Sequence, residues 1–299
     1  MPNAELEVRT YGADARPRVG FFTDTSLCIG CKACEVACKE WNHVPDDITG
    51  WTGDSYDNTR ALGADTWRHV AFIEQKVPVG ADGAARSLVK TAAVEGLADG
   101  ANLETYQEGD GLRWLMSSDV CKHCTDAACL DVCPTGALFR TEFGTVVVQE
   151  DVCNGCGYCV PACPFGVLDQ RKDDGRVWKC TLCYDRLKDD KEPACAQACP
   201  TNSIQFGELD ELHARAETRL AKLAAAGQDD ARLYLADRDD GIGGAGAFFL
   251  LLDEPEAYGL PPDPVATTHD LGSVWAAAGA AAVTLGAAIA AAVLGGAKR

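Results

Sequence analysis

Sixteen cysteines, gathered in four groups of four, constrain this 299-residue chain more than any other feature. In chain order the groups are Cys28, Cys31, Cys34 and Cys38; Cys121, Cys124, Cys129 and Cys133; Cys153, Cys156, Cys159 and Cys163; and Cys180, Cys183, Cys195 and Cys199. The first and third groups have the spacing C-x2-C-x2-C-x3-C. The second widens the middle gap to four residues, and the fourth widens it to eleven.

This spacing is typical of bacterial ferredoxins, which ligate [4Fe–4S] clusters. Three cysteines of one tight loop reach three iron corners of a cube, and the fourth, carried away by the following turn, points to a different cluster. The last cysteine of groups two, three and four is followed by proline, and that of group one by Lys39. Sixteen thiolates are enough for four complete [4Fe–4S] sites, and no cysteine is left over.

Other uses of cysteine fit the pattern less well. Disulfide frameworks are typical of short secreted chains, whereas this chain is long and its cysteines lie in local runs. Structural zinc sites use C-x2-C pairs separated by longer loops, and rarely three cysteines at this spacing followed by Cys-Pro. A c-type haem needs C-x-x-C-H, which is absent from the sequence. We therefore favour iron–sulfur clusters over a redox-inactive, cysteine-rich metal scaffold.

Composition excludes several classes of function. The chain has 27 Lys and Arg against 45 Asp and Glu, a net charge of −18, so no basic surface for nucleic acid is expected. Neither a nicotinamide fingerprint nor a Walker loop occurs in its required context, and the five histidines form no constellation of base and nucleophile. We interpret His123, inside the second cysteine group, as a neighbour of a cluster or a packing residue. No catalytic residue is predicted.

The chain divides into five predicted segments. They are residues 1–49 with cysteine group one, a β-rich insertion at 50–118, groups two to four at 119–206, an acidic helical and extended region at 207–271, and a transmembrane helix at 272–297. No apolar stretch precedes Phe21, so no secretory signal peptide is expected. Within the insertion, strands are predicted over Trp67–Ile73 and Arg86–Val94, with a turn at residues 80–83.

Residues 119–206 contain an internal repeat. Asp-Val-Cys at 119–121 recurs at 151–153, and Cys-Pro-Thr-Gly-Ala-Leu at 133–138 is echoed by Cys-Pro-Phe-Gly-Val-Leu at 163–168. The β-branched run Thr145–Gln149 suits a ferredoxin-type hairpin. The expected fold class is therefore α+β, with two duplicated bacterial-ferredoxin-like dicluster modules, a β-rich insertion and a single C-terminal transmembrane helix.

Two patterns stand out between residue 207 and the last segment. Five apolar residues from Leu209 to Leu223 recur at helical spacing, and Gly227 is a plausible stop. The glycine-rich stretch 241–246 precedes the apolar run Ala247–Leu252 instead of linking a strand to a helix. We interpret it as a loop before a buried strand, and the many acidic side chains of this region as a solvated surface.

The last segment is long enough to span a membrane. Val274 to Gly296 are 23 residues without a charge, mostly alanine and glycine, and Lys298 and Arg299 follow shortly. Gly279, Ala282 and Gly286 share one helical face that lets another helix approach closely. The alternative is a buried helix of a soluble protein. Because positive charges favour the cytoplasmic side, we expect the C-terminus inside and the cluster domain outside the cell membrane.

The cysteine groups over residues 20–206 resemble those of the iron–sulfur (β) subunits of molybdopterin oxidoreductases. Within that superfamily, Glu-Trp-Asn at 40–42, Ser-Tyr-Asp-Asn-Thr at 55–59 and Thr-Trp-Arg-His-Val at 66–70 make the chain look most like a formate dehydrogenase β subunit. The resemblance implies an electron-transfer subunit with four [4Fe–4S] clusters. It also implies crossed ligand sets: Cys28, Cys31, Cys34 and Cys199; Cys121, Cys124, Cys129 and Cys163; Cys153, Cys156, Cys159 and Cys133; and Cys180, Cys183, Cys195 and Cys38.

The same resemblance implies the partners. A catalytic subunit with a molybdenum or tungsten bis-pterin cofactor would oxidise formate, and the electrons would pass to a membrane cytochrome b subunit and quinone. Relatives with a three-iron cluster replace one cysteine with tryptophan, and all sixteen cysteines are present here. The alternative keeps the electron-transfer role but changes the catalytic partner to a hydrogenase or a sulfur-compound reductase.

Overall fold

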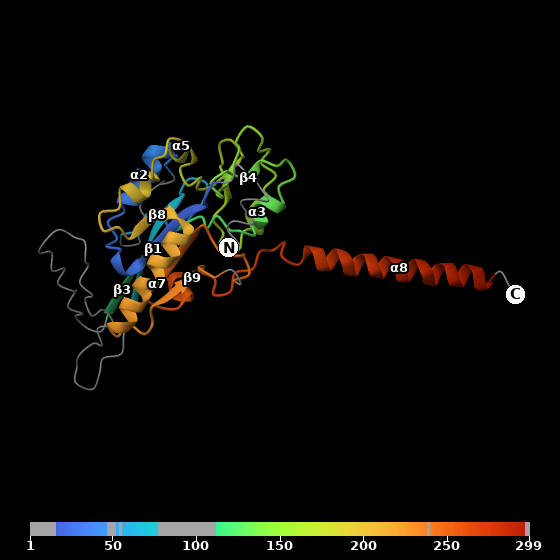
Figure 1. The fold of residues 1–299 in the computed structure, drawn as a ribbon. Coiled ribbons are helices and arrows are strands. Elements are labelled where there is room, and N and C mark those ends of the chain that lie inside the picture. Colours follow the sequence, from blue (N-terminus) through green and yellow to red (C-terminus); the bar gives the residue numbers. More distant parts are fainter. Residues whose placement is uncertain (1–15, 47–51, 54–55, 77–111, 238–239, 297–299) are drawn as a thin grey trace, which may run out of the picture.

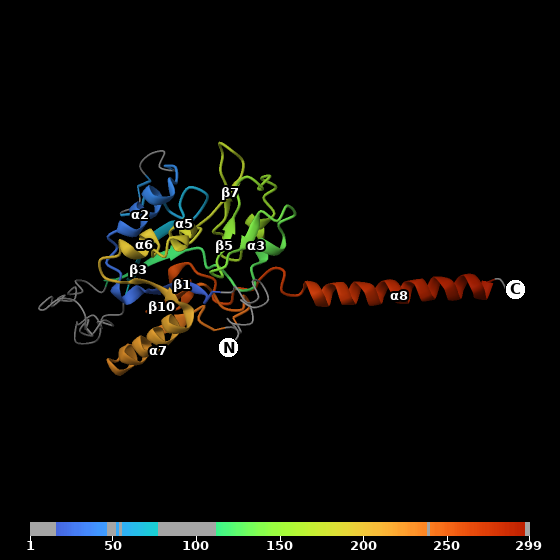
Figure 2. The same cartoon turned by 45° about the horizontal axis from the view of Figure 1, so that its top comes forward.

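The computed structural model of this protein describes residues 16–46, 52–53, 56–76, 112–237 and 240–296. Helices and strands are mixed along the described chain, as expected for an α+β protein. Figure 1 shows a body from which one long helix, α8 (Leu271–Gly296), projects alone. Figure 2, which turns this view by 45°, shows the same separation between α8 and the body.

A four-stranded sheet organises the body. Its strand order is β8 (Ile204–Glu208), β1 (Val19–Asp24), β10 (Ala247–Leu251), β9 (Arg232–Tyr234). Strand β1 runs parallel to β10 and antiparallel to β8. Every residue of β10 is buried, which confirms the buried strand predicted after the glycine-rich loop. The segment before cysteine group one is therefore joined by hydrogen bonds to strands about 180 and 225 residues later.

Neighbouring side chains of β1 face two different cores. Successive side chains of a strand point to opposite faces of its sheet. Phe21 packs among the buried cysteines, whereas Phe22 packs with the residues of α7 (Leu209–Ala225). The apolar face of α7 contains Leu209, Leu212, Ala216 and Leu223, all buried, as the helical spacing predicts. The sheet thus separates the cysteine-rich core from the core under α7.

The cysteine groups lie in loops held by short elements. In the described part of the chain these are the helices α2 (Ala33–Asn42), α3 (Ala128–Asp131), α4 (Cys159–Ala162), α5 (Tyr184–Lys188) and α6 (Ala194–Gln197), together with the 3-10 turn η2 (Thr25–Leu27). A further 3-10 turn, η3 (Pro255–Tyr258), follows β10. Two hairpins complete the set, β4 (Leu138–Arg140) with β5 (Val146–Val148), and β6 (Asp169–Gln170) with β7 (Val177–Trp178). The β-branched run around Val146 forms β5, as predicted.

Two long antiparallel strands lie in the region of the predicted insertion. The strand predicted over Trp67–Ile73 is observed as β2 (Arg68–Lys76), and its antiparallel partner is β3 (Leu112–Val120). The second predicted strand, Arg86–Val94, and the turn at residues 80–83 lie outside the described residues. Strand β3 ends one residue before Cys121, and its last residue, Val120, pairs with Arg68, the first residue of β2.

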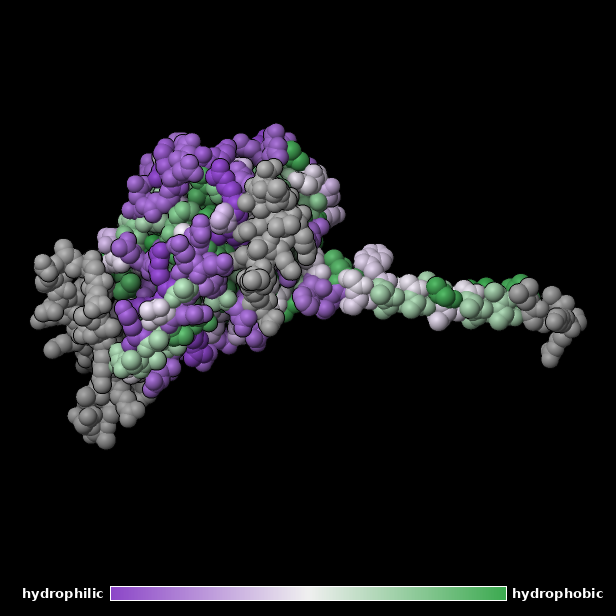
Figure 3. Space-filling view, viewed as in Figure 1, coloured by the Kyte–Doolittle hydropathy of each residue, from purple (hydrophilic) through white to green (hydrophobic). Residues whose placement is uncertain are grey.

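The C-terminal helix is long and apolar enough to cross a membrane. Its candidate span, Leu271–Val293, covers 23 residues, and every side chain in it is exposed. Apolar and neutral residues cover it, in contrast to the largely hydrophilic surface of the body (Figure 3). This exposure disfavours the alternative of a buried helix in a soluble protein, because such a helix hides its apolar side chains in a core.

Candidate metal centres

The structure gathers the sixteen cysteines into four quartets, which we number by the loop that supplies three of the members. Quartet 1 is Cys28, Cys31, Cys34 and Cys199; quartet 2 is Cys121, Cys124, Cys129 and Cys163; quartet 3 is Cys153, Cys156, Cys159 and Cys133; quartet 4 is Cys180, Cys183, Cys195 and Cys38. In each quartet, the fourth cysteine comes from a different sequence group.

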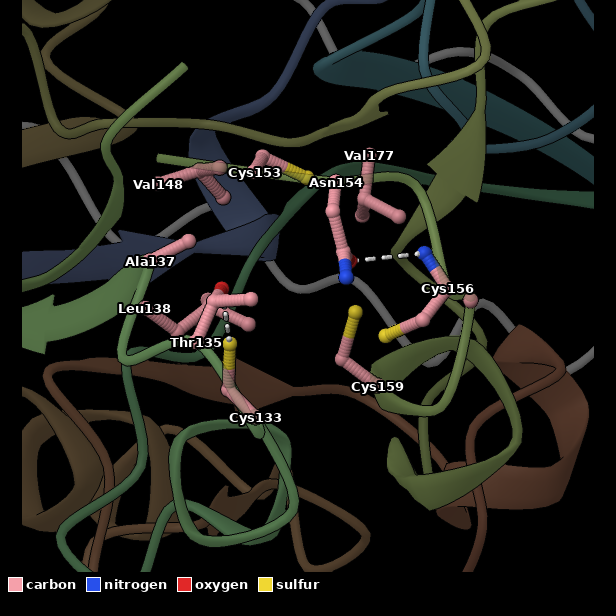
Figure 4. A pocket seen from close by; sticks show the side chains of 11 residues that line it. Cys133, Thr135, Ala137, Leu138, Val148, Cys153, Asn154, Cys156, Cys159 and Val177 are labelled. Carbon is pink, nitrogen blue, oxygen red and sulfur yellow. Dashed lines mark hydrogen bonds between the residues drawn. The ribbon is translucent and has the colours of Figure 1, made fainter. Parts of the chain in front are cut away.

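Quartet 3 lines a cavity between the second and third cysteine groups. Figure 4 shows Cys133, Cys153, Cys156 and Cys159 around this cavity, with the sulfur atoms of Cys133, Cys156 and Cys159 pointing into it. Including open solvent at its mouth, the cavity holds about 300 Å³ of empty space, and its other walls are largely apolar. The thiol of Cys133 is 3.6 Å from the Thr135 hydroxyl. Four cysteines lining one space suit a cluster that takes one thiolate at each corner.

Quartet 1 lines a second cavity at the other side of the cysteine-rich region. Its walls include Cys28, Cys31, Cys34 and Cys199, and it also has about 300 Å³ of empty space including open solvent. Cys199 follows α6, whereas Cys28 and Cys31 lie in the loop between η2 and α2, and Cys34 lies in the first turn of α2. Burial, followed by the neighbouring thiols Cys34, Cys199 and Cys31, raises the pKa of Cys28 to about 11.

Quartets 2 and 4 lie deeper in the protein. Burial and then the thiols of Cys121, Cys129 and Cys163 raise the pKa of Cys124 well above its usual value. The pKa of Cys38 is raised in the same way, first by burial and then by the nearby thiols of Cys180 and Cys195. The side-chain amide of Asn42 lies 3.7 Å from the sulfur atoms of both Cys38 and Cys183, so it connects the first and fourth sequence groups.

The quartets form a row in the order 1, 4, 2, 3. The thiols of Cys34 and Cys195 are close enough to interact electrostatically, so quartets 1 and 4 are neighbours. The thiols of Cys180 and Cys121 interact in the same way, so quartets 4 and 2 are neighbours. The thiols of Cys129 and Cys159 likewise connect quartets 2 and 3. All sixteen cysteines are described, and the two exposed ones, Cys31 and Cys156, belong to the two terminal quartets.

The quartets are not arranged around single metal ions. Among the described residues, no three His, Cys, Asp or Glu side chains form a group that could hold one ion. A tetrahedral zinc site would bring four sulfur atoms within about 2.3 Å of one point. Quartets 1 and 3 instead line cavities, as a multi-iron cluster held by four thiolates requires.

Buried cations that no sequence pattern predicts accompany the cysteines. Arg68, Lys122 and Lys179 are each at most 2% exposed. The Lys122 ammonium interacts with the Asp119 carboxylate and donates a 2.9 Å hydrogen bond to the Val120 carbonyl. Lys179 donates to the carbonyls of Val146 and Cys180. Such cations offset the negative charge of thiolate-ligated clusters, and their only signal in the sequence is their closeness to cysteines or to Trp67.

His123 is buried and uncharged. Its Nδ1 accepts a 3.1 Å hydrogen bond from the Val146 backbone N–H. Burial, together with the charges of Lys179, Arg18 and Arg140, holds its pKa well below the usual value. These contacts hold His123 in the packed region beside cysteine group two.

Comparisons with known proteins agree with this geometry. Two models of 4Fe-4S dicluster domains match the chain, one over residues 27–137 and the other over residues 112–209. Together they cover all four cysteine groups. These matches, with the quartets, define the class: the protein is an iron–sulfur protein built from 4Fe-4S dicluster domains, and its role is electron transfer.

Relatives narrow the class. The sequence is 40% identical over 262 residues to the nitrate-inducible formate dehydrogenase iron–sulfur subunit of Escherichia coli, an alignment of 86% of this protein and 76% of that one. It is 36% identical over 255 residues to the formate dehydrogenase-O iron–sulfur subunit of the same organism, with 84% and 73% covered. The protein therefore belongs to the family of formate dehydrogenase iron–sulfur subunits. It is also 34% identical over 193 residues to the B subunit of the E. coli anaerobic dimethyl sulfoxide reductase, with 64% and 75% covered.

Proposed function

We propose that the protein is the electron-transfer subunit of a membrane-bound formate dehydrogenase and that each quartet ligates one [4Fe–4S] cluster. A [4Fe–4S] cluster supplies one-electron redox chemistry when it is bound. The fit of the four quartets supports this ligand assignment: each combines three cysteines of one loop with one cysteine of another. The buried cations Arg68, Lys122 and Lys179 would stabilise the charge of the loaded sites.

The two ends of the row of quartets can each be assigned to a partner. Quartets 1 and 3 contain the two exposed cysteines, Cys31 and Cys156, so each end of the row reaches the surface. The segment leading into α8 packs against α3 and α4, because Ala266 contacts Ala128 and Ala162. We therefore assign the quartet 3 end to the membrane side and the quartet 1 end to the catalytic partner.

The partners follow from the relatives and from α8. A catalytic subunit with a molybdenum or tungsten bis-pterin cofactor would oxidise formate and reduce this subunit at the quartet 1 end. A membrane cytochrome b subunit would accept electrons at the other end and pass them to quinone. With Lys298 and Arg299 in the cytoplasm, α8 would span the membrane once and hold the cluster domain outside.

A sulfur-compound reductase is the second candidate. It is supported by the similarity to the dimethyl sulfoxide reductase subunit, which covers 64% of this protein. The formate dehydrogenase subunits align over 84–86% of it and so extend well beyond that match. We therefore favour formate as the substrate of the catalytic partner.

Electron paramagnetic resonance of the detergent-extracted native complex tests the proposal. Under anaerobic conditions, formate should generate the signals of reduced [4Fe–4S] clusters, because electrons would enter through the catalytic partner. Signals that appear with dithionite but not with formate would leave the electron-transfer role in place and reassign the partner. Reduction by hydrogen instead of formate would identify a hydrogenase.

A further inference from the structure

Arg68 is a buried cation that reaches quartet 1 through a single hydroxyl group. It lies at the start of β2, opposite Val120 of β3, and only 2% of it is exposed. Its Nη1 donates a 3.1 Å hydrogen bond to Ser118 Oγ. The same oxygen lies 3.3 Å from Cys34 Sγ, in quartet 1. One arm of the guanidinium is therefore connected to a cysteine of quartet 1.

The charge of Arg68 also acts on quartet 4. Among the thiols, Cys195 interacts with the guanidinium most strongly, and Cys180 and Cys38 of the same quartet also interact with it. A guanidinium keeps its proton in proteins, so Arg68 is a fixed positive charge between the two quartets.

Two nitrogen atoms of Arg68 have no oxygen or nitrogen to bond. Nε and Nη2 are fully buried, and neither has an oxygen or nitrogen partner among the described residues, but the Cys195 thiol of quartet 4 lies within hydrogen-bonding reach of the guanidinium. Buried N–H groups without a partner are rare in proteins, because each loses its hydrogen bonds to water. Here they lie in a cysteine-rich region, where the sulfur atoms of a loaded site can accept hydrogen bonds.

Lys122 provides a contrast at a similar depth. Its side chain is also buried, and its ammonium lies 4.9 Å from the ring centre of Phe249. The thiols on which its charge acts include Cys124 and Cys163, both members of quartet 2. Two buried cations of the same charge thus act on different quartets.

We propose that Arg68 is a positioning residue that sets the reduction potentials of the clusters in quartets 1 and 4 together. This inference rests on the proposed electron-transfer function. Each cluster gains one electron on reduction, and a fixed positive charge nearby stabilises the reduced form. Arg68 keeps its proton throughout, so no other group is transferred. The two sites would behave as a matched pair at the quartet 1 end of the row.

Potentiometric titration followed by electron paramagnetic resonance tests this inference on the detergent-extracted complex, with dithionite as the reductant. In Arg68→Gln, the reduction potentials of two of the four clusters should fall. For each of these clusters, the equilibrium constant for one-electron reduction should decrease at least about tenfold, which corresponds to a shift of about 59 mV. Arg68→Lys retains the charge and should keep both steps closer to the wild type. Lys122→Met should move a step that Arg68→Gln leaves unchanged.

The inference would be overturned if Arg68→Gln left all four reduction potentials unchanged or changed only one of them. It would also be overturned if Arg68→Gln changed the potential that responds to Lys122→Met. If Arg68→Gln fails to retain iron, Ser118→Ala decides the matter. Loss of this hydroxyl should lower the reduction potential of the cluster in quartet 1 alone. Four unchanged reduction potentials would refute the connection between Arg68 and quartet 1 through Ser118. Iron and sulfide content of the wild-type complex tests the proposed function separately, since fewer than four clusters would contradict it whatever Arg68 does.

Discussion

The Thr268 hydroxyl donates a 2.6 Å hydrogen bond to the carboxylate of Asp131, which lies 137 residues earlier in the sequence. Asp131 is the last residue of α3, the short helix that contains Cys129 of quartet 2. Helix α8 begins three residues after Thr268. This contact joins the segment that precedes the apolar helix to α3, and Figures 1 and 2 show that segment meeting the body on the side where α3 lies.

Cys163→Ser should damage the cluster of quartet 2 more than that of quartet 3, although Cys163 belongs to the third sequence group. The reason is that Cys163 lies among Cys121, Cys124 and Cys129. Cluster-resolved electron paramagnetic resonance and iron content measure the loss. The matched variant Cys156→Ser should damage quartet 3. Loss of the quartet 3 cluster in Cys163→Ser would refute the crossed pairing.

Deletion of residues 272–299 should release the subunit from membranes when it is expressed without partners. The side chains of Leu271–Val293 are all exposed, so removal of α8 should leave the thermal midpoint of the body unchanged. Flotation with phospholipid vesicles measures membrane binding, and the full-length protein is the control. A truncated subunit that still floats with the vesicles would count against a membrane span.

Leu212→Ala should lower the free energy of unfolding by about 2–5 kcal/mol, because it leaves a cavity between α7 and the sheet. Leu212 is 0% exposed. Urea unfolding followed by circular dichroism measures the change. Val36→Ala, at a position that is 60% exposed, should change the same quantity by less than about 0.5 kcal/mol. Equal effects of the two variants would contradict the packing of α7.

Arg219→Met should destabilise the body by about 3–5 kcal/mol, because it leaves a buried carboxylate without its ion-pair partner. Arg219 Nε lies 2.9 Å from Oδ2 of Asp24, whose side chain is 0% exposed. The control is Arg215→Met, which removes an exposed pair with Glu211 and should cost at most about 1 kcal/mol. Adding Asp24→Asn to Arg219→Met should recover part of the loss, and an additive further loss would contradict this explanation.

Bound iron should fall as the pH is lowered from about 8 to about 5, because protons compete with iron for the thiolates. Burial, with contributions from neighbouring thiols, raises the pKa of Cys129 and of Cys180 to about 12. A thiol with a raised pKa holds its proton more tightly, so this competition begins at a higher pH than for an exposed cysteine. Iron content after equilibration with a chelator measures it, and retention that is independent of pH would contradict the prediction.

Features set by local spacing could be predicted from the sequence. The runs of cysteines indicate cluster-binding loops because one short loop contributes three of the thiols. The spacing of Leu209, Leu212, Ala216 and Leu223 predicts the buried face of α7, and the uncharged stretch from Val274 predicts α8. These patterns depend only on the helical repeat and on the length of an apolar run.

Tertiary structure alone decided the remaining relationships. The pairing of β2 with β3, the order of the quartets and the place where α8 leaves the body all join residues that are far apart in the sequence. The position of Arg68 between two quartets belongs to the same class, since β2 carries it to Ser118, 50 residues later. Cysteine spacing states which thiols share a loop, whereas only the packing of the sheet and hairpins brings a thiol or a buried charge of one segment next to another.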